Sequence, residues 1–228
     1  MRILVTAGPT REPIDPVRFI SNRSSGKMGY AVARAAAARG HAVRMVSGPV
    51  HLAAPAGVDL VRIETADEML RAVANHLDWC QALVMAAAPA DWRPAQPAGR
   101  KLKKAAAPAA LPVARTPDIL QTLQPRKGAR TFVGFAAETG DPIPEARRKL
   151  RQKGLDLIVG NDVTQAGAGF ESDTNQVVLI AADGWEMPLP MMSKDAVGER
   201  IVRWLEERAA VAAGTVSPRL SGSRLRSG

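Results

Sequence analysis

The sequence predicts an α/β fold in which a Rossmann-like parallel sheet is covered by helices on both faces. Short apolar runs, such as residues 3–5 and 82–87, alternate with alanine-rich or amphipathic segments, as in successive strand-helix-strand units. Near the C-terminus the pattern changes, because two short runs flank the turn signal Ala182-Asp183-Gly184 and indicate a β-hairpin. The sequence therefore predicts a parallel sheet with a projecting C-terminal hairpin, which suits an interface between subunits.

The predicted elements follow one another along most of the chain. Gly40 is expected to end the first helix, Thr65 to cap the second, and Thr116, followed by Pro117, to cap a short helix. We expect residues 1–208 to form one domain, followed by a flexible tail at 209–228. The strands are expected at residues 3–5, 41–46, 59–64, 82–87, 131–136, 155–159, 175–181 and 185–189, and the longer helices at 30–40, 66–79, 143–153 and 193–208.

The composition is that of an ordinary globular protein, with 46% hydrophobic and 23% charged residues among 228. The single cysteine, Cys80, excludes an internal disulfide, fits the reducing cytoplasm and is expected to be buried. No apolar run is long enough to span a membrane, and the N-terminus enters a strand directly, which leaves no room for a signal peptide. The net charge of +9 raises the question of nucleic acid binding, but the basic residues are scattered and aromatic residues make up only 4%.

The loop between the first strand and the first helix carries the first functional signal. It is about sixteen residues long, whereas such connections usually have two to six residues. It ends in Ser24-Ser25-Gly26 at the helix start, where unpaired N–H groups and the helix dipole favour an anion. The spacing matches neither the dinucleotide motif G-x-G-x-x-G nor a Walker A loop. We expect these amides to bind phosphate.

Other candidates follow from the rule that ligands bind outside the carboxyl ends of parallel strands. Residues 86–94 leave the fourth strand, and Asp91 is the only acid among their small side chains. The cationic segment 99–104 lies in a stretch rich in proline and alanine, so it can form a mobile loop that closes over a triphosphate. Lys149 and Lys153 are four residues apart on one helix face, where a bridging anion would relieve their repulsion.

The usual catalytic motifs are missing from the sequence. None of the three histidines forms a pair with the spacing of metal ligands, and there is no G-x-S-x-G nucleophile elbow. The second strand ends in Ser47-Gly48-Pro49 and lacks the acid that would hold the ribose of NAD. The remaining groups suit phosphoryl or nucleotidyl transfer, in which the protein positions and neutralises its substrates.

Residues 7–29, AGPTREPIDPVRFISNRSSGKMG, resemble the opening signature of the phosphopantothenoylcysteine synthetase family. Residues 101–104 resemble the K-x-K-K flap of that family, and residues 134–139 are similar to its corresponding strand end. Residues 116–119 resemble its N-P-D-I turn, with threonine replacing asparagine, which weakens any role for a side-chain amide there. Ala88-Pro89-Ala90 and Trp92 stand where the family often shows valine and tyrosine.

The resemblance implies a two-step ligation in coenzyme A biosynthesis. The carboxylate of 4'-phosphopantothenate would react with CTP to give an acyl-cytidylate and pyrophosphate, and the amine of cysteine would then displace CMP. Asn22 and Lys101 are the implied catalytic residues, and Asp91 is the implied ligand of Mg²⁺. The implied substrate-binding residues are Arg18, Asn22, Ala87 and Ala88. The implied nucleotide-binding residues are Ser24, Ser25, Gly26, Ala86, Ala87, Asp91, Lys101, Thr116, Pro117, Asp118, Ile119, Phe135, Lys149 and Lys153.

The resemblance also implies a cytoplasmic homodimer without flavin in this chain. Bacterial members of the family are commonly fused behind a flavin-dependent decarboxylase. The expectation that the nucleotide is CTP and not ATP depends on the resemblance alone. Two alternatives stay open, a nucleotide-dependent oxidoreductase of the NAD(P) class and a basic nucleic-acid-binding module.

Overall fold

The computed structural model describes residues 1–103 and 110–215. An eight-stranded sheet of order β12-β11-β10-β9-β6-β1-β4-β5 runs through the molecule. Neighbouring strands from β5 to β10 pair in parallel, whereas β11 and β12 are antiparallel additions at one edge. The predicted α/β class and mainly parallel sheet are thereby confirmed. The strands are β1 (Arg2–Ala7), β4 (Ala42–Ser47), β5 (Val58–Arg62), β6 (Ala82–Met85), β9 (Thr131–Glu138), β10 (Leu157–Asp162), β11 (Thr174–Ala181) and β12 (Glu186–Ser193).

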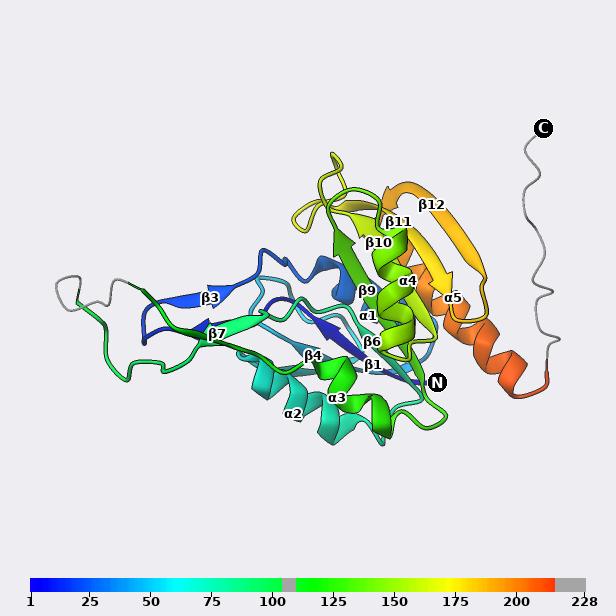
Figure 1. Cartoon of the computed structure of the whole chain (residues 1–228). Coiled ribbons are helices and arrows are strands. Elements are labelled where there is room, and N and C mark those ends of the chain that lie inside the picture. Colours follow the sequence, from blue (N-terminus) through cyan, green and yellow to red (C-terminus); the bar gives the residue numbers. More distant parts are fainter. Residues whose placement is uncertain (104–109, 216–228) are drawn as a thin grey trace.

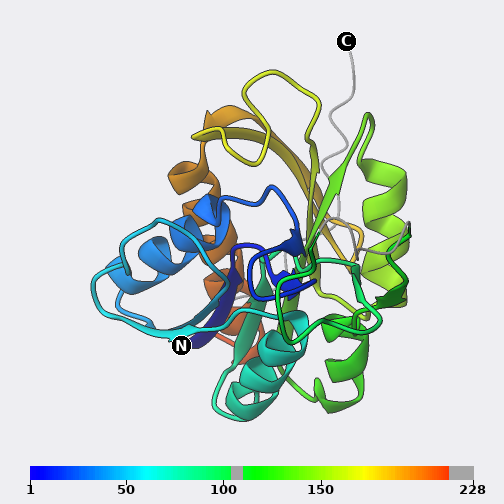
Figure 2. The same ribbon diagram turned by 90° about the vertical axis from the view of Figure 1, so that its left-hand side faces the viewer.

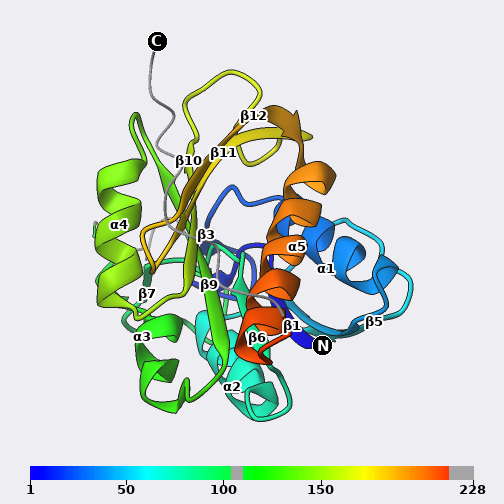
Figure 3. The same cartoon turned by 90° about the vertical axis from the view of Figure 1, so that its right-hand side faces the viewer.

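Helices cover both faces of the sheet (Figure 3). One face carries α1 (Lys27–Ala38) and α5 (Lys194–Ala212), which pack against each other as well as against the strands. The other face carries α2, α3 and α4, whose apolar side chains form a second core. These three helices span Ala66–His76, Ile119–Leu123 and Ile143–Gln152, and a short 3₁₀ helix at Gln124–Arg126 follows α3.

The alanine-rich composition of α1 has a packing explanation. Ala31, Ala33 and Ala36 are fully buried, because α1 lies between the sheet and α5. The approach of α5 is close enough that a Cβ on Gly198 would lie 2.8 Å from the backbone carbon of Ala31. Small side chains on α1 therefore allow two helices to share one face of the sheet.

Two short antiparallel pairs project from the body as an arm (Figures 1 and 2). One pair joins β2 (Arg11–Pro13) to β3 (Phe19–Ser21), and the other joins β7 (Trp92–Pro94) to β8 (Val113–Arg115). We define the arm as residues 10–21, 91–103 and 110–115. Residues 99–103 of the segment expected to be a mobile loop follow β7 and form no strand, and Lys104 lies outside the described residues.

Three local expectations differ from the structure. The final helix continues to Ala212, so residues 209–212 are helical and not part of a tail, while residues 216–228 lie outside the described chain. The short helix is capped by Asp118, which accepts a hydrogen bond from the amide of Gln121 at 3.1 Å, so the prediction of a Thr116 cap is wrong. The C-terminal hairpin is present, but it extends the edge of the main sheet and does not project from it.

Within the described residues no helix is both long and apolar enough to cross a bilayer.

We predict that Gly29→Val destabilises the fold, because Gly29 sets the distance between α1 and β1. A Cβ at this position would lie 2.6 Å from both the carbonyl oxygen of Thr6 and the Cβ of Ala7. Overpacking of this kind lowers the free energy of unfolding by about 1–3 kcal/mol, which urea denaturation would measure. Gly99→Val is the control, since a Cβ there would meet no described atom within 4 Å beyond its chain neighbours. Equal stability of the two variants would contradict the prediction.

Candidate active site

A cavity of about 620 Å³ lies at the carboxyl ends of the parallel strands. Its volume is within the range that binds small molecules and cofactors. Its walls come from the start of α1, the segment after β6, the α3–α4 side of the sheet, and the loop between β10 and β11. The lining includes Asn22, Ser24, Ser25, Gly26, Ala86, Ala87, Ala88, Asp91, Thr116, Pro117, Asp118, Ile119, Phe135, Lys149 and Lys153. The structure therefore brings together all but two of the predicted site residues.

The start of α1 forms the first wall. Gly26 precedes the helix with φ 78°, a conformation that favours glycine, and no hydrogen bond from a described side chain caps the first turn. The hydroxyl of Ser25 donates to the carbonyl of Phe170 at 2.5 Å, so this side chain holds the loop between β10 and β11. The uncapped amides and the dipole of a twelve-residue helix face the cavity, which makes this wall suitable for an anion.

The second wall is the small-residue segment after β6. The amides of Ala87 and Ala90 donate to the buried hydroxyls of Thr6 and Thr10 at 3.1 Å and 3.0 Å. The Asn22 side chain also holds this segment, because its Nδ2 donates to the carbonyl oxygens of Ala88 at 3.0 Å and Pro89 at 2.8 Å. Asn22, which the resemblance assigns to substrate binding and catalysis, thus donates both amide hydrogens to backbone carbonyls. Asn22 positions the small-residue segment in this state of the protein.

The third wall lies on the α3–α4 side of the sheet. Lys149 pairs with Glu138 at 2.7 Å, and Lys153 pairs with Asp118 at 2.9 Å. The predicted repulsion between the two lysines is thus offset by a carboxylate beside each of them. The Thr116 hydroxyl donates to the carbonyl of Ala90 at 2.5 Å, so it links this wall to the small-residue segment. An anion that binds here must replace carboxylate partners.

Two predicted residues, Arg18 and Lys101, are not among the described residues that line the cavity. Arg18 pairs with the buried carboxylate of Asp15 at 2.5 Å and donates to the carbonyl of Leu102 at 3.1 Å. The hydrogen bond from Arg18 holds the pKa of Asp15 well below its usual range. This contact fastens the two halves of the arm together and keeps exposed Lys101 on the arm.

Asp91 remains the candidate ligand for a metal ion. It is an exposed carboxylate in the cavity lining. The described residues include no group of three or more histidine, cysteine, aspartate or glutamate side chains that could hold an ion. Magnesium bound with a nucleotide needs only one or two carboxylates in addition to phosphate oxygens. A single aspartate therefore fits Mg²⁺ that arrives with a triphosphate.

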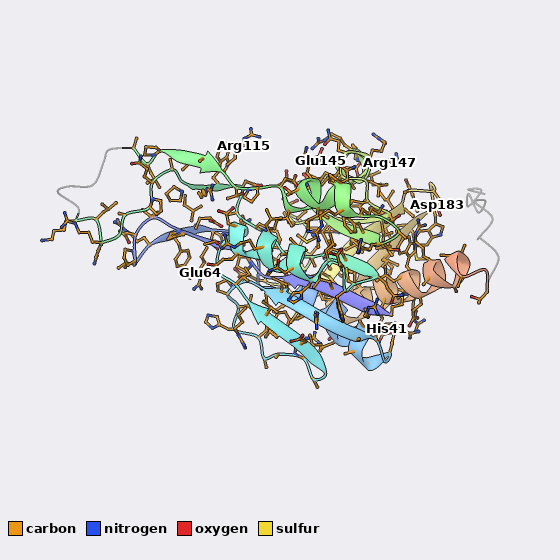
Figure 4. All side chains as sticks on the ribbon, turned by 90° about the horizontal axis from the view of Figure 1, so that it is seen from below. His41, Glu64, Arg115, Glu145, Arg147 and Asp183 are labelled. Atoms are coloured by element: carbon orange, nitrogen blue, oxygen red, sulfur yellow. The ribbon has the colours of Figure 1, made fainter. Side chains whose placement is uncertain are left out.

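The cavity also contains residues that the sequence did not identify. Arg115, labelled in Figure 4, is carried by β8. Its guanidinium carbon lies 5.4 Å from the centre of the Trp92 ring. The ammonium of Lys27 donates a hydrogen bond to the carbonyl of Glu171 at 2.7 Å and forms a salt bridge with Asp173 at 2.7 Å. Asn161, Asn175 and Lys194 also line the cavity. Asn161 lies at the carboxyl end of the parallel strand β10, next to its last residue, and could have been found by position. Asn175 and Lys194 required knowledge of the antiparallel pairing of the hairpin.

Lys194 and Cys80 both have shifted pKa values, and burial is the main cause of each. The pKa of Lys194 is lowered to about 8, because burial and the nearby charge of Lys27 disfavour the ammonium while Asp173 favours it. Burial raises the pKa of the Cys80 thiol to about 11, so the thiolate is scarce at neutral pH. The predicted structural role of Cys80 agrees with its burial.

Comparisons with known proteins place this geometry in a family. Residues 1–209 match the model of the DNA/pantothenate metabolism flavoprotein C-terminal domain. The chain is 48% identical over 213 residues to the coenzyme A biosynthesis bifunctional protein CoaBC of Mycobacterium bovis, covering 88% of this chain and 51% of that protein. Against CoaBC of Bacillus subtilis the identity is 45% over 214 residues, with 93% and 52% coverage. The chain thus spans about half the length of these curated relatives.

A solved structure gives the same assignment. The crystal structure of the C-terminal domain of CoaBC superposes with a TM-score of 0.78 at 40% identity, covering 91% of this chain and 95% of that one. A mutant of Cab2 in complex with phosphopantothenate-cysteine has a TM-score of 0.73 at 16% identity, with 95% and 89% coverage, and supports the fold. The resemblance of the opening signature is confirmed, and the chain belongs to the family of the DNA/pantothenate metabolism flavoprotein C-terminal domain, the synthetase part of CoaBC.

Proposed function

We propose that this chain is a phosphopantothenate-cysteine ligase that uses CTP. The observation that carries the proposal is the single cavity in which an uncapped helix start, a small-residue segment and two lysines meet. The helix start suits a phosphate, the small residues admit a ligand close to the backbone, and Lys149 and Lys153 supply positive charge. A nucleotide and a phosphorylated acid can therefore be held side by side.

In the first step, a carboxylate oxygen of 4'-phosphopantothenate attacks the α-phosphorus of CTP. A new P–O bond forms, and the bond to the β-phosphate oxygen breaks, so pyrophosphate leaves with the electron pair. The product is an acyl-cytidylate, a mixed anhydride. The amides of residues 24–26 and the lysines of α4 neutralise the phosphate oxygens, and Lys101 would meet the leaving pyrophosphate after the arm moves.

In the second step, the neutral amine of cysteine attacks the acyl carbon. A C–N bond forms, the acyl C–O bond breaks, and CMP leaves with the electron pair while the nitrogen loses a proton. No side chain bonds covalently to a substrate, so the protein contributes orientation and charge. Asn22 contributes by fixing the carbonyls of Ala88 and Pro89, which keeps the small-residue segment beside the reacting carbon.

Magnesium would bind through Asp91 and the phosphates of CTP. When bound, it offsets phosphate charge and orients the triphosphate.

Family membership favours the ligase over the oxidoreductase and nucleic-acid alternatives. We also propose a cytoplasmic location and action beside a flavin-dependent decarboxylase, since the curated relatives are named bifunctional. The chain itself is proposed to need no flavin.

We further propose a homodimer, and the exposed apolar residues favour the arm over the C-terminal hairpin as its interface. Val17 and Phe19 on the arm are 57% and 47% exposed. Leu111 and Val113 add to the same surface. A second copy seated on this surface would cover side chains that otherwise face water. Among the described residues, Met191 is the one large hydrophobic side chain of the hairpin with comparable exposure.

The activity prediction concerns the first half-reaction. With phosphopantothenate, Mg²⁺ and CTP but no cysteine, the protein should release about one pyrophosphate per active site, and cysteine should then permit steady turnover. A phosphate-release assay coupled to pyrophosphatase measures both phases. ATP in place of CTP is the comparison. Failure of every nucleotide to give pyrophosphate would overturn the proposed function.

The Asn22→Asp prediction separates the two steps. A carboxylate at this position would face the carbonyl oxygens of Ala88 and Pro89 in place of a donor and push the segment away. We expect a first burst of pyrophosphate to persist and steady turnover to fall by about 10²–10³, as for loss of a positioned donor. Asn75→Asp, on the exposed face of α2, is the matched control. Steady turnover equal to that of the unmodified protein would remove Asn22 from the mechanism.

The dimer prediction compares two surfaces. Phe19→Glu places a charge on the apolar surface of the arm, and Met191→Glu does the same on the hairpin. We expect Phe19→Glu to halve the mass measured by light scattering after size exclusion, because a buried unpaired charge opposes association. Met191→Glu should stay dimeric. The reverse result would assign the interface to the hairpin, and two unchanged masses would exclude both surfaces.

A further inference from the structure

Three buried polar residues on the α1–α5 side of the cavity have no role in the ligation described above. Asn161, Asn175 and Lys194 are 8%, 5% and 6% exposed, and they belong to β10, β11 and the first turn of α5. All three line the cavity. We call them the polar corner. It lies across the sheet from Lys149 and Lys153, which α4 carries on the other face.

The Asn175 side chain has an unmet hydrogen-bonding need. Its Oδ1 is buried and accepts no hydrogen bond from any residue that the structure describes. Among residues 1–103 and 110–215, it is the one buried side-chain nitrogen or oxygen without a hydrogen-bond partner. Buried acceptors are nearly always paired, since an unpaired one costs folding free energy. A ligand that carries an N–H or O–H donor would satisfy it.

Lys194 offers the opposite chemistry. Its ammonium donates to the carbonyls of Gly169 at 3.1 Å and Phe170 at 3.0 Å. An ammonium carries three N–H donors, so these two contacts leave one for a ligand in the cavity. The corner therefore combines an unpaired acceptor with a positively charged donor.

The hairpin register places these two groups on one side of the sheet. Asn175 pairs with Met192 in β12, and Lys194 directly follows the end of β12, where its backbone amide donates to the carbonyl of Asp173 at 2.9 Å. The pairing register of β11 and β12 shifts between Asn175 and Val177, where β12 carries one extra residue. Bulges redirect side chains and are common beside functional sites. The register shift thus lies next to the residue whose oxygen is unpaired.

We propose that the polar corner binds the α-amino acid substrate, with its amine on Asn175 Oδ1 and its carboxylate on Lys194 Nζ. This inference rests on the proposed ligation, which consumes cysteine. An amino acid supplies both a donor and a negative charge, as the corner requires. Phosphate oxygens lack donors in the fully ionised form, so a phosphate would face the Asn175 oxygen unfavourably. The corner is therefore suited less well to a phosphate group than to an amino acid.

An amide oxygen is also suited to the second step. It accepts a hydrogen bond from the amine without taking a proton, so the nitrogen keeps one lone pair for attack on the acyl carbon. The charge on Lys194 holds the carboxylate away from the developing negative charge of CMP. The polar corner would thus orient the amine of cysteine, while the start of α1 and the lysines of α4 would bind the groups that react in the first step.

The first test replaces Asn175 by leucine, which has a similar branched shape and no polar atom. We expect the KM for cysteine to rise about tenfold or more, because one orienting contact of the amine is lost. Pyrophosphate released in a single turnover without cysteine is the internal reference and should stay within about twofold. The Tm should not fall, since the variant removes an unpaired polar atom and no protein hydrogen bond. Asn75→Leu, an exposed asparagine of α2, is the control.

An unchanged KM for cysteine, or a rise confined to CTP or phosphopantothenate, would overturn the inference. A lower Tm would assign the Asn175 amide to the fold. If the leucine variant does not fold, Asn175→Ala replaces it under the same criteria. Absence of pyrophosphate from the unmodified protein would instead remove the proposed ligation, so the two failures are distinguishable.

The second test uses cysteamine, which has the amine and thiol of cysteine but no carboxylate. Lys194→Met should lower kcat/KM for cysteine by about tenfold and leave kcat/KM for cysteamine within about twofold, because only cysteine has a group for the ammonium. Equal losses for both amines would show that Lys194 acts only by holding the carbonyls of Gly169 and Phe170, and would overturn its role in binding.

Discussion

The contact of Gly29 with β1 determines where the active site forms. Because Gly29 has no side chain, α1 lies directly on the backbone of Thr6 and Ala7 at the carboxyl end of the strand. The first turn of α1 and its unpaired amides are therefore brought to the sheet edge at which the other parallel strands also end. Thr6 also holds the small-residue segment, since its hydroxyl accepts a hydrogen bond from the amide of Ala87, which follows the neighbouring strand β6.

The sequence was sufficient to predict features that depend on local chemistry. Apolar periodicity identified the buried strands, the alanine-rich segment identified α1, and the turn signal identified the C-terminal hairpin. The same local reasoning placed Ser24–Gly26 at a helix start and Asp91 after β6, and both line the cavity. These predictions succeeded because each depends on residues close together in the chain and on the rule that parallel strands bind ligands at their carboxyl ends.

Features that depend on distant pairings could not be predicted in this way. The antiparallel direction of β11 puts its first residues, including Asn175, at the edge where the parallel strands end. A rule about carboxyl ends overlooks such a residue. The arm is another case, since the contact of Asp15 with the amide of Leu102 joins segments 87 residues apart. The contacts of Asn22 with the carbonyls of Ala88 and Pro89 could not be predicted either, because those carbonyls lie on another loop.

The partners of the basic residues bear on the proposed binding of a triphosphate by a chain of net charge +9. Lys149, Lys153 and Lys27 each have a carboxylate partner at 2.7–2.9 Å in the absence of ligand. A single phosphate contact gains little where it only exchanges one anion for another. A triphosphate can replace several partners at once, and its charges are held together by covalent bonds, so it loses less entropy than separate anions would. The carboxylate partners of the lysines thus favour a ligand with several negative charges close together, such as a triphosphate, over a ligand that brings one charge to each contact.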